Sequence, residues 1–353
     1  MDIDEGQVEE FANQVFGTLV GAVTHAMVVV GDELGLYRAL ATSGPVTPAA
    51  LAAATDTHER YVREWLLQQA AVGFVTYDDQ AGTFALPPEH AAVLAFEDSP
   101  AFLAPAAQLP AGMFRGSDRL VDAFRTGEGI GWDQQDPIVF THTERFWRAA
   151  YRPHLTSRWL PALDGVVDRL RAGARVADVG CGHGAAAILM AEAYPASRFV
   201  GFDLHAQSIE TARERAADAG VGDRVRFEVA DAADYPADGY DLITFFDTLH
   251  DLGDPVGAAA YARSALAPDG SLLLVELRAE DDVAANLATP GAAVGYAAST
   301  FLCTPNSLSQ PVGLALGSQA GEQRLRDVLA EAGCSHVGRV DETLLNAVYE
   351  VRP

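Results

Sequence analysis

The sequence predicts an α/β fold: a Rossmann-like, doubly wound sheet with an antiparallel last strand, preceded by a mainly helical winged-helix domain. From about Val166 onward, short apolar runs typical of buried strands alternate with helical stretches. Before that point, apolar residues recur three or four positions apart, which indicates helices. We therefore expect three parts, at 1–99, 100–165 and 166–353.

The N-terminal part opens with an apolar stripe at helical spacing. Its members are Val8, Phe11, Val15, Leu19, Ala22, Ala26 and Val29. The stripe predicts a long helix that exposes more apolar surface than this small unit can bury alone. We expect a homodimer to cover the excess. The apolar region from Phe16 to Val30 is broken by polar residues and is too short to predict a membrane span.

Two further helices and a hairpin follow. Thr47 and Pro48 predict a helix start, because a hydroxyl cap followed by proline is typical of a first turn. Thr57 is expected to cap a second helix, 58–71, and residues 74–86 predict two strands around a polar turn. The inward side chains of that second helix should be Tyr61, Leu66 and Ala70. Helix, helix and hairpin in this order are a winged-helix pattern.

The charges disfavour DNA binding by this winged helix. Glu59 and Glu64 accompany the arginines of helix 58–71, and the hairpin turn carries Asp78 and Asp79. The chain has a formal net charge of −25, which repels nucleic-acid phosphates and anionic membranes. We therefore expect a dimerisation module, with no nucleic-acid and no membrane partner.

The cysteines and the N-terminus indicate a compartment. Cys181, Cys303 and Cys334 are odd in number and scattered, so no disulfide framework is predicted. The N-terminus is acidic, unlike a signal peptide. We expect a cytoplasmic protein.

The middle part, 100–165, is interpreted as a helical connector that contributes to a substrate pocket. Trp147, Tyr151 and His154 have the spacing of one helical face. They either form a wall of the pocket or pack into an interdomain core. Further aromatic candidates for the pocket lining are Phe114, Phe140, Phe246 and Phe301.

The third part alternates strands with helices. Strands are expected at 175–179, 198–203, 225–231, 240–246, 271–276, 336–340 and 344–351. Helices are expected at 185–194, 255–266 and 323–332. The last two strands are separated by a short turn, so they must pair antiparallel at the sheet edge. The insertion at 278–320 shows little periodicity and is interpreted as a lid over the substrate.

A nucleoside-shaped site is predicted at the carboxyl ends of the first three strands. Gly180, Gly182 and Gly184 follow Asp178 and let a ligand approach the backbone at a helix N-terminus. Asp203 ends the second strand, where a carboxylate can accept hydrogen bonds from ribose hydroxyls. Asp231 follows the third strand and suits an exocyclic adenine amine. The spacing departs from the dinucleotide fingerprint and disfavours a nicotinamide dehydrogenase.

These motifs resemble class I S-adenosylmethionine-dependent methyltransferases. Leu249-His250-Asp251 is similar to the catalytic segment of small-molecule O-methyltransferases of the plant caffeate and hydroxyneurosporene type, in a bacterial branch; Leu252 replaces the tryptophan usual after it. The resemblance implies a winged-helix dimerisation domain, a catalytic His250 and an orienting Glu276. It implies a cofactor, S-adenosylmethionine, whose product is S-adenosylhomocysteine. The implied cofactor-binding residues are Asp178, Gly180, Gly182, Gly184, Asp203, Leu204, Asp231, Ala232 and Phe246. The implied substrate residues are Trp147, Tyr151, Asp247 and Phe301.

His250 can remove the proton from an acceptor hydroxyl, because its ordinary pKa is close to neutral. We therefore expect methyl transfer to oxygen on a small, largely apolar acceptor. The alternatives are transfer to carbon or nitrogen, or a non-catalytic winged-helix regulator that senses S-adenosylmethionine. His250 could instead be structural or a metal ligand, as in related C-methyltransferases of α-keto acids. No histidine lies between His250 and His336 to complete such a site, so no metal is predicted.

Overall fold

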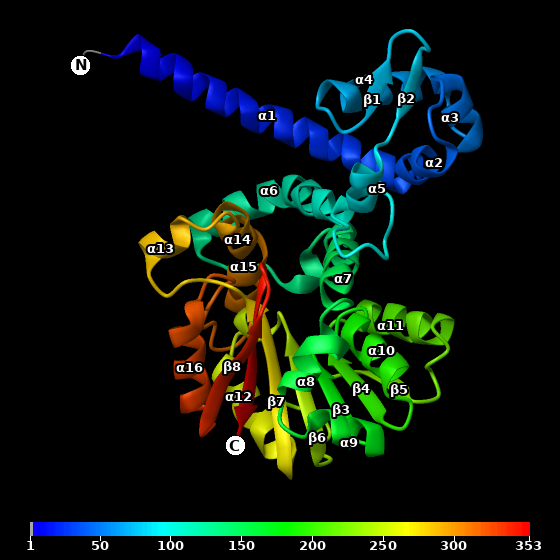
Figure 1. Ribbon diagram of the computed structural model, residues 1–353. Helices are drawn as coiled ribbons and strands as arrows, with labels where there is room; N and C mark the ends of the chain where they lie inside the picture. The colour runs from blue at the N-terminus through cyan, green and yellow to red at the C-terminus, as the bar shows by residue number, and fades with distance from the viewer. Residues whose placement is uncertain (1–2) are drawn as a thin grey trace. The chain divides into compact units, whose positions relative to one another are not determined.

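Two units make up residues 3–353, the part of the chain that the computed structural model describes (Figure 1). The first contains the described residues up to 115 together with 137–149, and the second contains 116–136 and 150–353. The division passes through two helices, α6 (Gln108–Thr126) and α7 (Pro137–Tyr151).

The first unit contains the predicted helices and hairpin. Its elements before α6 are α1 (Glu5–Glu33), α2 (Leu36–Ser43), α3 (Pro48–Ala54), α4 (Glu59–Ala71), β1 (Thr76–Asp78), β2 (Thr83–Ala85), α5 (Pro88–Leu94) and η1 (Ala104–Ala107). Thr47 caps α3 as predicted, because its hydroxyl accepts a hydrogen bond from the Ala50 amide at 3.3 Å. Strands β1 and β2 pair antiparallel.

Two predictions for α4 are wrong. The cap is His58, whose ring accepts from the Arg60 amide, while the Thr57 hydroxyl bonds to that of Thr55. Tyr61 is 80% exposed. Leu66 is buried as predicted, and the residues that share its inward face are Val62, Trp65 and Gln69. Tyr61 therefore lies on the solvent-facing side of α4, outside the set of residues that the helical repeat places toward the core.

Helix α1 is continuous over the predicted stripe, and most of that stripe is exposed, as expected; Val29 is its buried member. Its buried residues lie near the C-terminal end, at Thr24, Val28, Val29 and Gly31. Phe11 and Phe16 are 65% and 62% exposed. By length and hydropathy α1 could cross a membrane, a test that core helices of soluble proteins also pass.

The chain between the sheet and the winged helix is helical. Besides α6 and α7 it contains η2 (Trp132–Gln134), η3 (Leu155–Trp159), α8 (Leu160–Ala162) and α9 (Val166–Ala172). Helix α7 ends at Tyr151, so His154 does not share its face with Trp147 and Tyr151 as predicted. His154 lies beyond the helix end, with its ring stacked on Trp159.

The second unit is built on a seven-stranded sheet in the order β5-β4-β3-β6-β7-β9-β8. The strands are β3 (Arg175–Val179), β4 (Arg198–Asp203), β5 (Val225–Val229), β6 (Tyr240–Phe246), β7 (Leu266–Leu277), β8 (His336–Glu342) and β9 (Asn346–Arg352). Strands β3 to β7 are parallel, whereas β9 pairs antiparallel with both β7 and β8, as predicted. Strand β7 begins at Leu266, earlier than the expected 271, and its register against β6 shifts between Tyr240 and Leu242.

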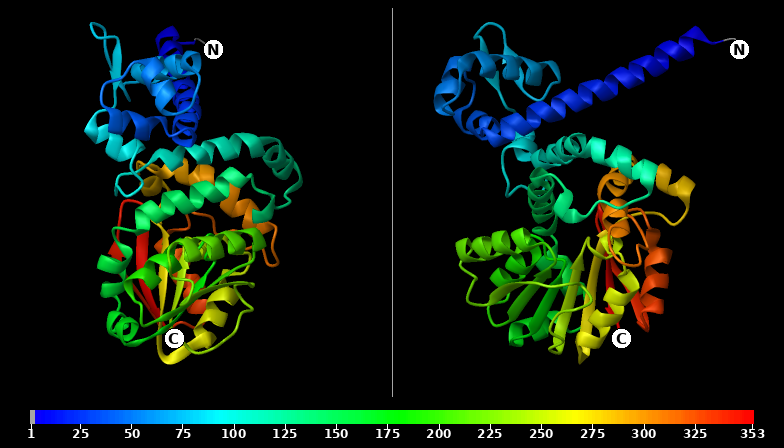
Figure 2. Two further views of the ribbon diagram at one scale, coloured as in Figure 1. Left: turned by 90° about the vertical axis from the view of Figure 1, so that its right-hand side faces the viewer. Right: turned by 180° about the vertical axis from the view of Figure 1, so that it is seen from behind.

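Helices lie on both faces of this sheet (Figures 1 and 2). The helices are α10 (Ala185–Ala193), α11 (Ala206–Asp218), α12 (Pro255–Ala265) and α16 (Gly321–Glu331). α10 and α11 pack on β4 and β5, while α12 packs on β7 and on α16. Buried apolar side chains such as Ile243 and Val351 fill the interfaces, so burial of apolar surface holds the layers together.

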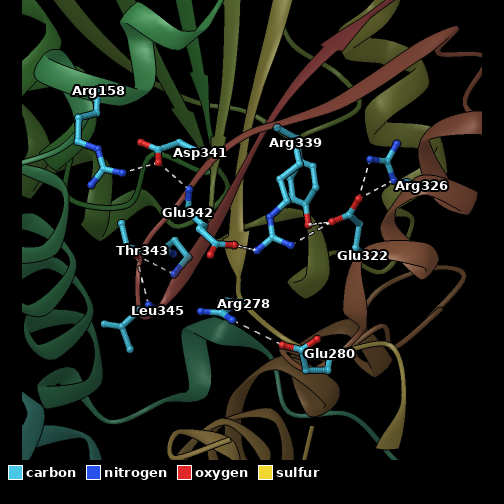
Figure 3. Close-up of polar contacts among 12 residues, drawn as sticks. Arg158, Arg278, Glu280, Glu322, Arg326, Arg339, Asp341, Glu342, Thr343 and Leu345 are labelled. Atoms are coloured by element: carbon cyan, nitrogen blue, oxygen red, sulfur yellow. Dashed lines mark hydrogen bonds and ion pairs between the residues drawn. The ribbon is translucent and has the colours of Figure 1, made fainter. Parts of the chain in front are cut away.

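The antiparallel edge carries a network of charged side chains (Figure 3). Glu322 of α16 accepts hydrogen bonds from Arg326 at 2.6 Å, Arg339 at 3.3 Å and the Tyr349 hydroxyl at 3.5 Å. Arg158 of η3 pairs with Asp341 of β8 at 2.5 Å. These partly exposed pairs join the helices to the last hairpin, and each adds little stability by itself.

The segment between β7 and α16 is more regular than its sequence suggests. It forms α13 (Val283–Leu287), α14 (Ala292–Ala298), a π-helical turn η5 (Ser299–Cys303) and α15 (Thr304–Leu308). These helices are too short to show a clear apolar period.

Candidate functional site

The turn from β3 into α10 depends on glycine. Gly180 and Gly182 have φ of 72° and 51°, in the left-handed region that other residues rarely adopt. A Cβ on Gly180 would lie 2.2 Å from the Thr248 side chain, whereas a Cβ on Gly182 would meet no atom within 4 Å. The backbone is therefore tightly packed at Gly180 and open at Gly182, where a ligand can approach.

Asp203 holds this glycine turn. One carboxylate oxygen accepts a hydrogen bond from the Gly182 amide at 2.9 Å, and the other accepts from His205 at 2.8 Å. Burial raises the pKa of Asp203, and these two bonds oppose the rise. Each oxygen keeps a second acceptor direction. The carboxylate can therefore accept from the two hydroxyls of a ribose, as the sequence predicts.

Asp178 is buried with one oxygen unsatisfied. Its Oδ1 accepts from the Thr244 hydroxyl at 2.8 Å, while Oδ2 has no hydrogen-bond partner. Burial, followed by the negative charge of Asp203, raises the pKa of Asp178 to about 7. An unpaired buried carboxylate oxygen fits a ligand that carries a positive charge.

The remaining predicted nucleoside residues lie at the ends of β4 and β5. Leu204 is 66% exposed, and Ala232 is half-buried. Asp231 is exposed, and one of its oxygens accepts from the Ala233 amide at 2.8 Å. Its second oxygen can accept from an adenine amine.

His250 and Glu276 form a buried pair. His250 lies in η4 (Leu249–Asp251) after β6, and Glu276 lies near the end of β7. The Glu276 carboxylate accepts from the His250 amide at 3.2 Å and contacts ring Nδ1. Burial alone lowers the pKa of His250, but the Glu276 charge, assisted by Cys303, outweighs it and raises the pKa well above its ordinary value.

A second buried acid lies beside this pair. The hydroxyl of Tyr151 donates to Asp247, and the Asn346 side-chain amide lies 3.0 and 3.1 Å from the two Asp247 oxygens. Burial and the Glu276 charge raise the pKa of Asp247 to about 7. Asp247 also has a φ of 49°, a strained conformation that persists where the surroundings require it. The Phe246 ring lies 5.2 Å from that of Tyr151.

The contacts described above do not include two of the predicted substrate residues. Trp147 belongs to the first unit, where its ring meets that of Phe146 edge-on with the centroids 5.0 Å apart. Phe301 is half-buried in η5, and its carbonyl lies 3.4 Å from the Gln135 amide nitrogen. Their place in a pocket stays a prediction.

Four polar residues of the site were not predicted from the sequence: Thr244, Thr248, Asn346 and Cys303. Thr244 and Thr248 flank the end of β6 and bond to Asp178 and to the Gly180 carbonyl. Their position in the sequence, as polar residues within an apolar strand and in the loop after it, could have indicated a role in the site. Asn346 and Cys303 are distant in sequence from their partners, so no local pattern indicated them.

The residues fit the nucleoside and charged groups of S-adenosylmethionine. Asp203 would hold the ribose, Asp231 the adenine amine and the open glycine backbone the amino-acid part. The unpaired oxygen of Asp178 lies beside this turn and suits the cationic character of the molecule.

Comparisons with known proteins agree with this geometry. Residues 170–333 match the family model of a methyltransferase domain, and residues 22–96 match an Rv2258c-like winged HTH domain. The 27-O-demethylrifamycin SV methyltransferase of Amycolatopsis mediterranei is 38% identical over 121 residues, 34% of this chain. That match spans 44% of the relative's own length. The mitomycin biosynthesis 6-O-methyltransferase of Streptomyces lavendulae is 28% identical, over 76% of this chain and 77% of the relative.

Solved structures show the same fold. The mitomycin 7-O-methyltransferase has a TM-score of 0.70 at 24% identity, covering 99% of this chain and 100% of its own. Human N-acetylserotonin methyltransferase, solved with S-adenosylmethionine, has a TM-score of 0.67 at 18% identity, covering 100% and 98%. The predicted α/β fold with a winged-helix domain is thereby confirmed.

The buried Asp178 predicts a pH-dependent stability. Its folded pKa of about 7 exceeds the ordinary 3.8, so the protonated carboxyl is favoured by folding. This contribution is complete below about pH 4 and is lost as the pH rises through 7, at a cost on the order of 4 kcal/mol. We expect urea unfolding at pH 5 and pH 8 to show a smaller loss of stability for Asp178→Asn than for the unchanged chain.

Asp218→Asn is the matched control, since Asp218 is exposed at the end of α11. If the free energy of unfolding fell equally between pH 5 and pH 8 in the unchanged chain, Asp178→Asn and Asp218→Asn, ionisation of Asp178 would have no cost in stability.

Proposed function

From the premise that the chain carries a class I S-adenosylmethionine-dependent methyltransferase domain behind a winged-helix domain, we propose that it methylates an oxygen atom of a small, largely apolar acceptor. The observation that carries this proposal is the buried His250–Glu276 pair, which follows Thr248, a residue bonded to the Gly180 carbonyl of the glycine turn. A histidine oriented by a carboxylate is suited to removing a hydroxyl proton.

S-adenosylmethionine, when bound, supplies an electrophilic methyl group on a sulfonium centre. The chain's task is then to place the acceptor oxygen in line and remove its proton. Glu276 fixes Nδ1 of His250, which leaves Nε2 to accept that proton, and the carboxylate stabilises the imidazolium that forms. Only unprotonated His250 can act, so the raised pKa places the active form toward higher pH.

An aromatic acceptor suits the site. The rings of Tyr151 and Phe246 lie beside Asp247. Because the pKa of Asp247 is about 7, its carboxyl can be protonated near neutral pH and can form a hydrogen bond with an acceptor hydroxyl. A structural relative from neocarzinostatin biosynthesis was solved with S-adenosyl-L-homocysteine and 1,4-dihydroxy-2-naphthoic acid, at 20% identity and a TM-score of 0.62 over 93% of this chain and 95% of its own. A hydroxylated ring is therefore the first acceptor class to screen. Product analysis distinguishes transfer to oxygen from transfer to carbon or nitrogen.

The first unit serves assembly in this proposal rather than DNA binding. Arg60 and Arg63 of α4 pair with Glu64 and Glu59 on the same helix, which neutralises the charges that would meet phosphates. The exposed apolar face of α1 suits a second copy of the chain, because a symmetric pair buries the same stripe twice. A cytoplasmic location accords with the three free cysteines.

Cofactor binding tests the premise directly. Calorimetric titration with S-adenosylhomocysteine should show binding that weakens about 100-fold or more in Asp203→Ala, because two hydrogen bonds to a charged group are lost. Asp203→Asn should be intermediate, since it keeps an acceptor for Gly182. Asp218→Ala should bind as the unchanged chain does. Absence of binding by the folded, unchanged protein would refute the proposal.

The pH profile tests the catalytic pair. Glu276→Gln removes the charge that raises the pKa of His250, so the rising limb of kcat/KM should move about one pH unit or more to lower pH. His250→Ala should lower kcat by about 10²- to 10⁴-fold while S-adenosylhomocysteine still binds. Glu350→Gln, a buried carboxylate elsewhere in β9, should leave the profile in place. A limb that does not move in Glu276→Gln would contradict this role for the pair.

Sedimentation tests the assembly. We expect twice the chain mass for the unchanged protein and a monomer for the double variant Phe11→Glu, Phe16→Glu, because charges would enter the paired apolar face. Leu344→Glu, exposed at the opposite end of the sequence, should remain a dimer. A monomeric unchanged protein would refute the dimer, and retarded migration of DNA would favour the regulator instead.

A further inference from the structure

Three different donor atoms meet next to the His250–Glu276 pair. A ring nitrogen of His250, a carboxylate oxygen of Asp251 and Sγ of Cys303 all lie within 4.8 Å of one another. His250 and Asp251 belong to η4, while Cys303 ends the π-helical turn η5. His250 and Cys303 are 4% and 6% exposed. The cluster therefore joins two segments of the second unit in a largely dry environment.

The prediction of no metal rested on the lack of a further histidine between His250 and His336. Cys303 takes the place of the missing histidine. A thiolate, an imidazole and a carboxylate are all ordinary ligands of zinc, which most often has four ligands in a tetrahedral arrangement. Magnesium and calcium prefer oxygen ligands throughout, so the sulfur disfavours them.

The histidine is already oriented as a ligand. Its Nδ1 contacts the Glu276 carboxylate, which leaves Nε2 for the Cys303 thiol or for an ion bound between the two side chains. A carboxylate on the second nitrogen is the usual support of a metal-bound histidine, because it fixes the ring and increases its basicity.

Asp251 has an unused oxygen. Its Oδ1 is buried and makes no close hydrogen bond, although the Cys303 thiol interacts with this carboxyl. A buried carboxylate oxygen without a partner is costly, and it commonly indicates a group that a ligand satisfies. The buried Asp251 oxygen is an observation separate from the orientation of His250, and it also favours a bound cation.

Hydrogen bonds hold the two segments together. Asn306 of α15 donates to the Asp251 carbonyl at 3.1 Å, and the Ser307 hydroxyl donates to the Leu252 carbonyl at 2.7 Å. Gln310 adds a bond to the same Asp251 carbonyl at 3.3 Å. Cys303 immediately precedes α15, so these bonds keep its thiol near η4 without a bound ion.

Ligand atoms around zinc at about 2.0–2.3 Å are separated from one another by about 3.3–3.8 Å, which is about 1 Å or more below the limit of 4.8 Å that holds for the three donor atoms here. Small side-chain movements would complete the shell, with a water molecule as fourth ligand.

We propose that His250, Asp251 and Cys303 bind one Zn²⁺ ion, and that this ion inhibits methyl transfer by occupying the lone pair of His250. Binding releases the Cys303 thiol proton to solvent as the S–Zn bond forms. The ion and the acceptor's proton then compete for Nε2. The inhibition rests on the proposed function, whereas binding of the ion does not.

Metal binding is measured first, on the full chain with Co²⁺ as a spectroscopic probe for Zn²⁺. We expect one equivalent to give a thiolate charge-transfer band and visible bands of a four-coordinate site, both abolished by Zn²⁺. Cys303→Ser should lose the charge-transfer band. Cys303→Ser and Asp251→Asn should each weaken Zn²⁺ binding more than about tenfold, since even outer-shell changes have effects of that size.

Cys334→Ser is the matched control, because Cys334 is also buried but lies between α16 and β8. It should retain the band and the affinity. Urea midpoints measured with a chelator establish that each variant is folded. No stoichiometric binding, or a band that persists in Cys303→Ser, would overturn the proposal.

Inhibition is measured second. Saturating Zn²⁺ should lower the transfer rate of the unchanged protein at least tenfold, and a chelator should restore it. Cys303→Ser, compared with its own metal-free rate, should resist the same concentration. Binding accompanied by an unchanged or increased rate would overturn the inhibitory role. A protein without any transferase activity would refute the proposed function and leave the metal measurement intact.

Discussion

The parallel register of β3, β4, β6 and β7 is the constraint on which the site depends. Because these strands run in one direction, their carboxyl ends meet at one edge. The glycine turn, Asp203, Asp247 and Glu276 all follow from that register. A slip of one residue in any of these strands would turn the acid at its end toward the opposite face. Apolar burial between the helical layers fixes the register, so the core determines where the polar groups lie.

The same arrangement gathers negative charge in a buried region. Asp178 and Asp247 both have pKa values of about 7, and burial is the largest cause in each case. Hydrogen bonds from Thr244, Tyr151 and Asn346 satisfy part of this charge. The remaining buried negative charge is unfavourable when no ligand is bound, because Oδ2 of Asp178 and Oδ1 of Asp251 make no close hydrogen bond. A cationic ligand offsets that cost, so the instability of the free site contributes to binding.

His250 illustrates how one residue can support two chemistries. Glu276 raises the pKa of its ring, and the same contact would orient the ring toward an ion in the proposed metal site. Which use prevails depends on the partner at Nε2. Cys303 decides this in our view, because a neutral thiol leaves the lone pair available, whereas a zinc thiolate brings the ion to it. The segment 278–320, interpreted from the sequence as a lid, thereby contributes a group at the reacting edge.

The sequence alone determined the elements whose signals are local. The strand β6 and the antiparallel β9 could be read from their apolar runs, and the Thr47 cap from a single dipeptide. The pairing of His250 with Glu276 came from the family resemblance, since 26 positions separate them. Local periodicity was insufficient for Tyr61, which lies on the exposed side of α4, and for His154, which lies beyond the end of α7.

Only the tertiary structure placed Asn346 on Asp247, and Cys303 beside Asp251. These contacts join segments about 50 to 100 positions apart. They arise from the way helices and the last hairpin pack on the sheet, an outcome of the whole core rather than of any short stretch of chain. Backbone preferences act over a few residues and are readable in order along the sequence. The chemistry of the site depends on distances across the fold, which no local preference sets.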